Sequence, residues 1–463
     1  MCLSNSGRSL QKCAQTGGVF VKQTTSANIT VSQNAGKHPF VTSSRAAVVS
    51  TVAHNARSVY HRRVAVAVVH RVSVFPLAIP LRRKVLHAAA QRAVADPVIV
   101  AVELTNGIVG YGETHPRTYV TGETVEFVIA AIRDVFTPAL ISFHAESFPE
   151  ALEAIEALPW QDAADRPIPA ARTAVELAML DAVLRTYRRN MDAVVQWMGL
   201  PGFGLPGSIG RIRYSGVLAC DDAASTMRQL RWMYWGGLRD FKLKVGVPGD
   251  HELVQRVARY LRIPLATDRA TLRVDANGAW SVDEAVEWLA ATEHLPIAAL
   301  EQPVAPGQEQ NLVRAAGFMP RDAAPDIMHD ESLVTMDDAR RLIDLGIADA
   351  FNIRISKCGG LIPSLRLAAL ARRHDVLVQL GCMVGETSLL SAAGLRFLQV
   401  CPMVAWAEGC FGSFLLAGDT VARPLRFGYG GRPPKLRGEG LGVRVEPDRL
   451  RPWCVTEPVV LNL

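Results

Sequence analysis

Six charged residues at nearly regular spacing end or follow apolar runs in the second half of the chain. Neighbours in this series are 26 to 31 residues apart, close to the length of one β-strand plus one α-helix. In a parallel β/α barrel, one such side chain from each consecutive strand reaches the rim where active sites are built. The series consists of Lys244, Asp275, Glu301, Asp330, Lys357 and Glu386.

Three acids of this series, Asp275, Glu301 and Asp330, come from consecutive predicted strands. Packed together without a counter-ion they would repel one another, and one or two would have to take up protons. A hard divalent cation removes this conflict, and an all-oxygen set of ligands favours Mg²⁺ or Mn²⁺ over Zn²⁺. The sequence therefore predicts a Mg²⁺ site at these carboxylates, with Mn²⁺ as the alternative.

Lysine is scarce in this chain, which makes its few positions informative. Between residues 85 and 434 the only lysines are Lys242, Lys244 and Lys357. A desolvated Lys can lose its proton, whereas Arg effectively cannot. Lys357 comes four strands after Lys244, which in an eight-stranded barrel is the opposite wall. A metal between two amines suits removal of a proton from carbon next to a carboxylate; buried ion pairs with neighbouring acids are the alternative.

The elements that must position these side chains alternate along the chain from about residue 212. The predicted strands are Ile212–Ala219, Asp240–Val245, Thr271–Val274, Ile297–Leu300, Asp326–Met328, Ala350–Ile355, Val376–Leu380 and Met403–Ala407. The predicted helices between them are His251–Leu261, Val282–Ala291, Asp337–Leu345, Ile362–His374 and Thr387–Val400. This alternation predicts a parallel β/α barrel. An open doubly wound sheet is the alternative, although Leu218–Asp221 is not the Gly-rich phosphate loop that usually follows its first strand.

The part of the chain before the barrel is predicted to be a smaller α+β unit. Strands are expected at Val64–Pro76, Asp96–Thr105 and Val109–Glu113. The helices expected after them are Glu123–Val135, Ser147–Leu158 and Ala170–Arg188. A stretch rich in Gly and Pro at residues 199–210 then marks a domain boundary.

Composition excludes several classes of protein. The chain has 463 residues, of which 49% are hydrophobic and 20% charged, as expected for two or three globular domains. No apolar run approaches the roughly 18–20 residues of a membrane helix. Residues 1–95 carry 13 Lys or Arg and no acid, whereas the remainder has a net charge of −7, so the basic character does not indicate nucleic-acid binding. Eight cysteines without a CxxC pair fit a reduced compartment, and we expect a cytoplasmic protein.

Residues 1–63 lack a sustained helical or strand period. Three interpretations stay open for them: a disordered extension or a misplaced start codon, an organelle transit peptide, and a basic arm that binds an anionic partner.

Six short motifs contain or flank the residues of the charged series and the end of the barrel: KxK at Lys242–Lys244, DANGAW at Asp275–Trp280, EQPV at Glu301–Val304, DES at Asp330–Ser332, NIRISKCGG at Asn352–Gly360 and GEGLGV at Gly438–Val443. These motifs resemble those of the enolase superfamily, and most closely its muconate-lactonizing subgroup. The resemblance covers about residues 64–450. The His base that the mandelate racemase subgroup places after the seventh strand is replaced by Leu380-Gly381-Cys382.

The resemblance implies an α+β capping domain on a modified (β/α)7β barrel of the TIM type. We expect an extension at residues 1–63, the capping domain at 64–200, the barrel at 201–420, and a segment at 421–463 that returns toward the capping domain. Loops at His87–Gln91 and Thr114–Glu123 would close over the site and set its specificity. The second loop holds His115 and Arg117, which could bind an anionic group but as loop-tip residues are more often solvated.

The resemblance also assigns roles to the site residues. Asp275, Glu301 and Asp330 would ligate the metal. Lys244 and Lys357 would be the opposed acid–base pair, with Lys242 helping to neutralise the substrate carboxylate. Glu386 matches a glutamate near the active site of the subgroup, or alternatively is an acid at a helix N-terminus that satisfies backbone donors.

The predicted activity is Mg²⁺-dependent abstraction of the α-proton of a small-molecule carboxylate through an enediolate. The presence of both lysines favours a racemase or epimerase of an amino-acid derivative or dipeptide. A cycloisomerase or a dehydratase of the succinylbenzoate type is the alternative within this chemistry. A non-catalytic carboxylate-binding barrel is the alternative of another class. We expect a homo-oligomer without a nucleic-acid or membrane partner.

Overall fold

The computed structural model describes residues 66–87, 90–205, 208–219, 222–247, 249–316, 324–436 and 438–463. The expectations for residues 1–63 lie outside this part. Among the described residues, none of the helices combines the length and the apolar character needed to cross a membrane.

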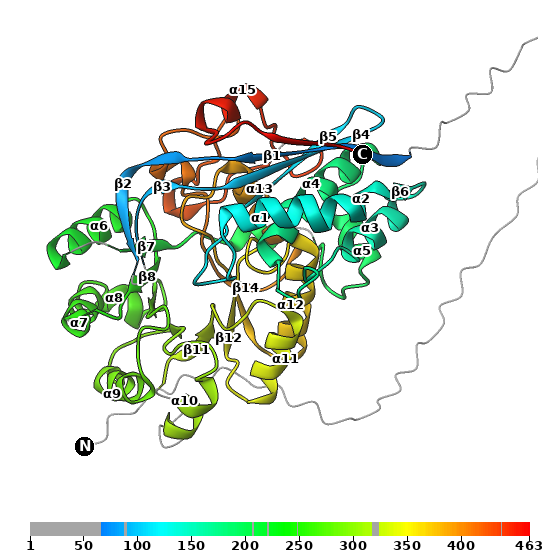
Figure 1. Cartoon of the computed structure of the whole chain (residues 1–463). Helices are drawn as coiled ribbons and strands as arrows, with labels where there is room; N and C mark the ends of the chain where they lie inside the picture. Colours follow the sequence, from blue (N-terminus) through cyan, green and yellow to red (C-terminus); the bar gives the residue numbers. More distant parts are fainter. Residues whose placement is uncertain are drawn as a thin grey trace, which may run out of the picture. The chain divides into compact units, whose positions relative to one another are not determined.

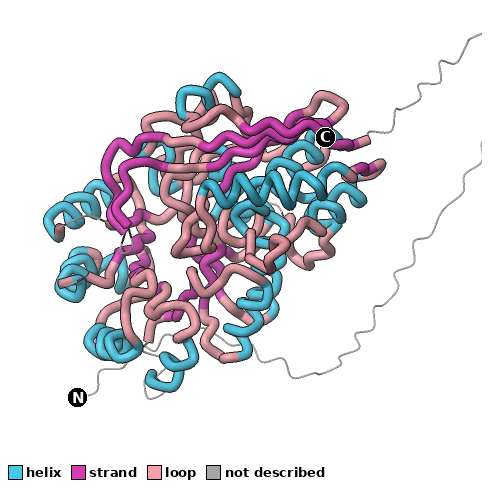
Figure 2. Tube along the Cα trace, viewed as in Figure 1, coloured by secondary structure: helices cyan, strands magenta, loops and turns pink. Residues whose placement is uncertain are grey.

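Eight parallel strands of the second half form one sheet in chain order (Figures 1 and 2). The strands are β7 (Gly216–Leu218), β8 (Asp240–Lys244), β9 (Thr271–Asp275), β10 (Ala299–Glu301), β11 (Asp326–His329), β12 (Ala350–Ile353), β13 (Leu377–Leu380) and β14 (Val404–Ala407). A parallel bridge between Tyr214 and Ala407 brings the start of the first strand to the last one and closes the barrel. The predicted barrel is thereby confirmed.

A helix follows each of the first seven strands, which gives the (β/α)7β pattern. The helices are α6 (Ala223–Trp235), α7 (Asp250–Tyr260), α8 (Arg262–Ala266), α9 (Val282–Thr292), α10 (Glu309–Ala316), α11 (Met336–Asp344), α12 (Leu361–Arg373) and α13 (Ser388–Val400). Their inner faces are apolar, as in α11, where Ala339 and Leu342 are buried and the charged residues face outward. Short helices α14 (Gly412–Leu415) and α15 (Pro447–Leu450) follow the last barrel strand.

The capping domain is an antiparallel sheet covered by helices. The sheet order is β15 (Val459–Asn462), β1 (Ala67–Pro76), β4 (Val98–Leu104) and β5 (Val109–Thr114), with β6 (His144–Ala145) also paired to β1. The helices are α1 (Val125–Ala131), α2 (Thr137–Ile141), α3 (Phe148–Glu156), α4 (Pro169–Thr186) and α5 (Met191–Trp197). The end of the chain thus adds a strand to the sheet of the N-terminal half.

Helix α4 is buried on nearly every side and packs directly on the sheet. Gly110 and Gly112 of β5 make this close approach possible. A Cβ atom built on Gly110 would lie 2.2 Å from the carbonyl oxygen of Ala178, and one on Gly112 would lie 2.0 Å from that of Ala174. A larger residue at either position would force the helix away from the sheet.

The first expected specificity loop is mostly β-structure. Strands β2 (Ile79–His87) and β3 (Ala90–Ala95) pair as an antiparallel hairpin, with His87 opposite Ala90, where a loop at His87–Gln91 was expected. Residues 88–89 lie outside the described residues. The expectation of a loop over His87–Gln91 is therefore corrected to the end of a hairpin, because backbone pairing continues up to both sides of residues 88–89.

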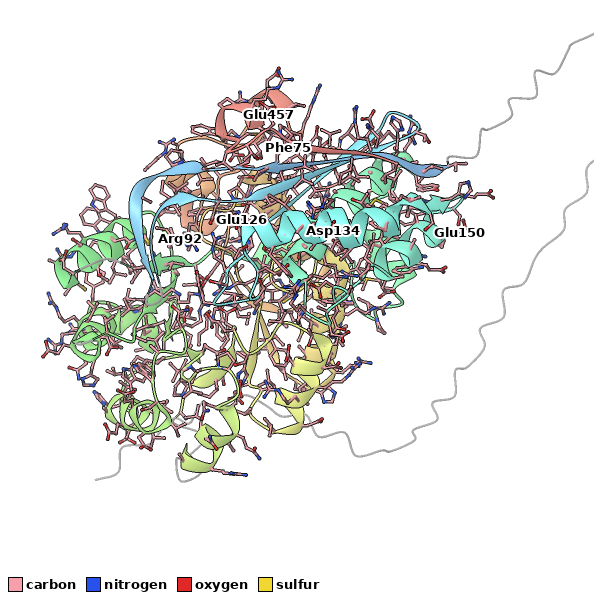
Figure 3. All side chains as sticks on the ribbon, in the orientation of Figure 1. Phe75, Arg92, Glu126, Asp134, Glu150 and Glu457 are labelled. Carbon is pink, nitrogen blue, oxygen red and sulfur yellow. The ribbon has the colours of Figure 1, made fainter. Side chains whose placement is uncertain are left out.

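Buried acids of the capping domain bond to the barrel, whereas others such as Glu126 and Glu150 point into solvent (Figure 3). Glu176 accepts hydrogen bonds from the backbone N–H groups of Leu361 (3.1 Å) and Ile362 (2.8 Å), at the start of α12. Glu113 accepts from the N–H groups that open α13, as described below. Because these N-terminal N–H groups have no partner within their helices, the capping domain fixes the loops that precede them.

Candidate active site

The carboxyl ends of β8, β9 and β10 bring the first members of the charged series together. Lys244 ends β8 and is paired in register with Asp275, which ends β9; Asp275 is in turn paired with Glu301, which ends β10. Asp330 directly follows β11. The four side chains therefore start from one rim of the barrel, as their spacing predicts.

Lys242 is buried among three carboxylates. Its Nζ atom lies 2.9 Å from Oε2 of Glu408, 3.2 Å from Oε2 of Glu301 and 3.3 Å from Oδ2 of Asp275. Burial alone would lower the pKa of Lys242, but these three anions outweigh it and raise the pKa. Lys242 is thus a permanent cation that holds the acids of β9, β10 and β14 together.

Lys244 is the more accessible of the two lysines on β8. Its side chain is 20% exposed, and Nζ lies 2.7 Å from Oδ2 of Asp275 and 2.7 Å from Oδ1 of Asn277. Although burial acts to raise it, the pKa of Asp275 is lowered because Lys244 and Lys242 stabilise its charged form. The amine of Lys244 is therefore held at the rim by two oxygens and stays reachable from solvent.

Lys357 does not reach the barrel opening. Its side chain is fully buried, and Nζ donates to Oδ1 of Asp330 (2.9 Å), to the carbonyl oxygen of Asn352 (3.0 Å) and to the carbonyl oxygen of Asp330 itself. All three hydrogens of the ammonium group thus have acceptors within the protein. These contacts fix the turn between β12 and α12.

The side chain that emerges at the end of β12 is Arg354. It immediately follows the strand, and its guanidinium contacts Oδ2 of Asp330 and lies 3.6 Å from Oε1 of Glu301. Burial alone would lower the pKa of Arg354, but Asp330, Glu331 and Glu301 raise it. Because β12 is four strands from β8 in the eight-stranded barrel, Arg354 faces Lys244.

Glu301 lies at the centre of this network. Its carboxylate accepts hydrogen bonds from Lys242, from Nδ2 of Asn352 (2.8 Å) and from Nε2 of Gln379 (3.2 Å). Burial raises the pKa of Glu301 to about 7, and the charge of Asp275 adds to the rise. Burial and Asp330 likewise raise the pKa of Glu331 to about 7. Burial and the neighbouring carboxylates thus disfavour the ionised forms of Glu301 and Glu331.

The donor set fits a hard divalent cation. Asp275, Glu301 and Asp330 supply carboxylate oxygens from adjacent strand ends, and burial together with the charge of Asp275 raises the pKa of Glu301. Among the described residues, however, no three His, Cys, Asp or Glu side chains converge closely enough to hold an ion as they stand. The guanidinium of Arg354 lies against Asp330, where it competes with a metal for the same carboxylate.

Metal binding is expected to stabilise the folded protein. Mg²⁺ at 100 times its dissociation constant should raise the free energy of unfolding by about 2.7 kcal/mol, because the ion binds the folded chain alone. Thermal unfolding with and without Mg²⁺ measures this. Glu301→Gln should lose the Mg²⁺-dependent increment, and an increment of equal size in both proteins would contradict the assignment of Glu301 as a ligand.

Glu386 lines the cavity and does not cap the following helix. Its Oε1 accepts from the backbone N–H of Met383 (2.6 Å), and burial raises the pKa of Glu386 to about 8. Glu113 of the capping domain occupies the start of α13 instead, accepting from the N–H groups of Thr387 (2.8 Å) and Leu390 (2.9 Å). Glu386 is therefore largely protonated at neutral pH and can donate a hydrogen bond into the cavity.

The first residues of the second expected specificity loop, Thr114–Arg117, are buried, whereas Thr118, Tyr119 and Gly122 are exposed. His115 and Arg117 are 1% and 2% exposed, which differs from the expectation of solvated loop-tip residues. Nη1 of Arg117 lies 2.7 Å from Oδ1 of Asp96, and Nε2 of His115 lies 2.8 Å from Oε1 of Glu113. These contacts occupy both side chains, although Arg117 still reaches the cavity wall.

A cavity of about 1020 Å³ opens over this rim. Its charged floor is formed by Lys242, Lys244, Arg354, Glu386 and Glu408. Lys357 is not among the described residues that line it. Of the two lysines that the spacing places on opposite walls, one therefore reaches the cavity and the other stays in the protein interior.

Arg354 and Glu408 belong to this floor, but neither was among the predicted site residues. The predicted strand Ala350–Ile355 extends two residues beyond the observed end of β12 at Ile353, so Arg354 was hidden inside a predicted strand. Glu408 directly follows β14, where the sequence reads Glu408-Gly409-Cys410 and has one acid in place of the Asp-x-Asp pair common in dipeptide epimerases.

These features define a parallel-barrel enzyme with strand-end carboxylates and amines, and the comparisons with known proteins agree. Residues 69–199 match the mandelate racemase / muconate lactonizing enzyme N-terminal domain family, and residues 225–449 match the enolase C-terminal domain-like family. The chain belongs to the muconate-lactonizing-enzyme-like subgroup of the enolase superfamily, and it is an isomerase.

Similar proteins catalyse more than one isomerisation. The chain is 27% identical to an N-succinyl-L-Arg/Lys racemase of Bacillus cereus over 84% of this chain and 98% of that protein. It is 31% identical to an L-Lys-D/L-Arg epimerase of Methylococcus capsulatus over 76% of this chain and 91% of that protein. The structure of a muconate lactonizing enzyme from Pseudomonas putida superimposes with a TM-score of 0.70 at 25% identity, covering 84% of this chain and 100% of that one.

Proposed function

We propose that the protein is a Mg²⁺-dependent isomerase that removes the proton from the carbon next to a substrate carboxylate, and that Lys244 is the base. The observation that carries this proposal is the accessibility of the amines. Lys244 is 20% exposed at the cavity floor, whereas the side chains of Lys242 and Lys357 are 2% and 0% exposed. A base must come within hydrogen-bond reach of the proton that it removes.

Proton transfer is confined to one face of the substrate carbon. The group opposite Lys244 is Arg354, and a guanidinium does not deprotonate in proteins. When Lys244 takes the proton, the electrons of the C–H bond delocalise onto the carboxylate as an enediolate. The electrons of the enediolate then leave with the carbon–oxygen bond on the neighbouring carbon as that bond breaks; in the reverse direction this bond forms and Lys244 returns the proton to the same face, while Arg354 and Lys242 contribute fixed positive charge.

Asp275, Glu301 and Asp330 are proposed to hold the Mg²⁺ ion. When bound, the ion would supply positive charge for the oxygens of the substrate carboxylate. Asp330 can bind the metal only if the guanidinium of Arg354 moves away from its carboxylate. A substrate carboxylate would provide another anion with which Arg354 can pair. Glu386, neutral at pH 7, would donate a hydrogen bond to a leaving or attacking oxygen.

One-face transfer favours a cycloisomerase-type reaction. In such a reaction, the carbon that exchanges a proton is bonded to a carbon whose bond to oxygen forms or breaks within the same molecule. One base can therefore remove the proton in one direction of the reaction and return it in the other. The lactonizing enzyme of Pseudomonas putida, by its name, carries out such a ring closure.

A racemase or epimerase is the second candidate. The names of the Bacillus and Methylococcus relatives support it. It would require a second amine on the far face, and the burial of Lys357 beneath Arg354 argues against one. The presence of both lysines, which favoured this activity from the sequence, therefore carries less weight than their positions.

Deuterium exchange tests the proposal and separates the two candidates. With Mg²⁺ and single enantiomers of N-acylamino acids in D₂O, we expect deuterium to enter at the α-carbon while optical purity is retained. NMR measures the deuterium, and chiral chromatography measures the optical purity. Loss of optical purity at the rate of exchange would support epimerisation and overturn one-face transfer. Absence of Mg²⁺-dependent exchange for every carboxylate tried, including lactones and their open-chain acids, would contradict the proposed function.

A further inference from the structure

One half of the cavity is apolar, and its residues do not belong to the charged floor. They come from α6 and the turn after it, from α14 and its flanks, and from Phe427. This surface, here called the apolar wall, consists of Met233, Leu238, Phe411, Phe414, Leu415 and Phe427. It is built on the side of the barrel where the chain before β7 pairs with β14, next to the strand that carries Lys244.

The centre of the apolar wall is an aromatic cluster. The ring of Phe427 lies 4.8 Å from that of Phe414, 5.8 Å from that of Phe411 and 6.0 Å from that of Tyr214, measured between centroids. The main chain near Tyr214 is fixed as well, since its N–H donates to the carbonyl oxygen of Gly431 (2.7 Å). A cluster packed in this way presents a preformed apolar surface.

The mouth of the cavity leaves large apolar groups in water. Trp232 and Tyr429 line the cavity and are 74% and 69% exposed. Exposed apolar surface next to a concave site is typical of a ligand-binding site, where a bound ligand covers that surface. Both residues continue the apolar wall outward from the aromatic cluster.

The size of the cavity exceeds what the reacting group needs. A carboxylate and its α-carbon occupy only a small part of about 1020 Å³, a volume at the upper end of small-molecule sites. The carboxylate end belongs at Lys244 and Arg354 on the charged floor. The rest of the substrate must then extend along the apolar wall.

We propose that the substrate carries a bulky apolar group, preferably aromatic, that packs against Phe411, Phe414 and Phe427 while its carboxylate lies at Lys244 and Arg354. This inference rests on the proposed function, because that function places the carboxylate on the charged floor. An anionic side group is disfavoured. Arg117 is already paired with Asp96, and the carboxylate of Glu408 lies on the floor.

A matched series of substrates tests the proposal on the wild-type protein. N-acetyl derivatives of alanine, phenylalanine and aspartate, each as both enantiomers with Mg²⁺, are compared for α-deuterium exchange by NMR and for binding by calorimetry. We expect kcat/KM at least tenfold higher for phenylalanine than for alanine, and lower for aspartate than for alanine. Equal values, or a preference for aspartate, would overturn the proposal.

The two readouts separate this inference from the proposed function. Tighter binding of the phenyl compound without exchange would support the apolar wall and contradict the assigned chemistry. Exchange at equal kcat/KM for all members of the series would agree with the proposed chemistry and contradict the proposed role of the apolar wall. No binding of any member would contradict both.

Two tryptophans of α6 provide a matched pair of variants. Trp232 and Trp235 have nearly equal exposure, 74% and 71%, and their rings contact each other, but Trp232 lines the cavity and Trp235 does not. Trp232→Ala should reduce the ratio of phenylalanine to alanine kcat/KM several-fold, and Trp235→Ala should preserve it. An equal loss of the ratio in both variants would show that damage to α6, and not the wall, sets the preference.

Discussion

Lys244→Ala should lower α-proton exchange by about 10²- to 10⁴-fold, because Lys242, the other lysine that lines the cavity, is held as a cation by three carboxylates and does not accept the proton. Lys244→Arg should be impaired to a similar degree, since it keeps the positive charge but cannot give up its proton. The measurement is the rate of deuterium incorporation at saturating Mg²⁺ and substrate. Unfolding midpoints of both variants serve as the control for folding.

The pair of variants distinguishes a base from a binding cation. If Lys244→Arg keeps exchange near the wild-type rate while Lys244→Ala loses it, Lys244 supplies charge alone and the assigned chemistry is wrong. If both variants lose exchange and still bind the carboxylate, the side chain must act through its free amine.

Lys357→Ala should have its main effect on stability. The change removes one of the two buried cations that contact Asp330 and removes the hydrogen bonds of Nζ to the carbonyl oxygens of Asp330 and Asn352. Removing one partner of a buried ion pair typically costs about 3–5 kcal/mol in free energy of unfolding. Urea denaturation measures the loss, and Lys244→Ala, at a partly exposed position, should cost distinctly less.

The contrary result for Lys357 is equally clear. If the wild-type protein inverts the α-carbon, and if Lys357→Ala loses this inversion while its stability is unchanged, Lys357 is a second base. In that case the side chain would have to leave its three acceptors and reach the far face when substrate binds.

The barrel and its rim could be predicted because strand ends in a parallel barrel share one edge. Asp275 and Glu301 each end a short apolar run, and the register of β9 and β10 pairs them directly. Spacing of one β/α unit was enough to find them. The same reasoning found Lys244, which ends β8 two residues after Lys242 and therefore lies on the same face of the strand, nearer to the opening.

The choice between Arg354 and Lys357 could not be made from spacing. Both belong to the turn after β12, where the N–H of Lys357 donates to the carbonyl oxygen of Arg354 (2.9 Å). A three-residue difference there decides whether a side chain faces the cavity or the protein interior. The scarcity of lysine in the sequence favoured Lys357 over Arg354. The side chain that faces the cavity is set instead by the end of β12 at Ile353.

The hairpin of the capping domain was missed for a local reason. Residues 86–90 read Leu-His-Ala-Ala-Ala, without the Asn-Gly or Asp-Gly pair that marks a tight hairpin turn. The role of Glu113 was missed for a long-range reason. Its partners Thr387 and Leu390 lie more than 270 residues further along the chain, and nothing in the sequence near Glu113 indicates them.

The central claim is that a lysine and an arginine, and not two lysines, face each other across the substrate carbon. A crystal structure with Mg²⁺ and a bound, unreactive carboxylate analogue tests it most directly. The account predicts Nζ of Lys244 within about 3–3.5 Å of the α-carbon on one face and the guanidinium of Arg354 on the other. Nζ of Lys357 at that distance on the far face would contradict it.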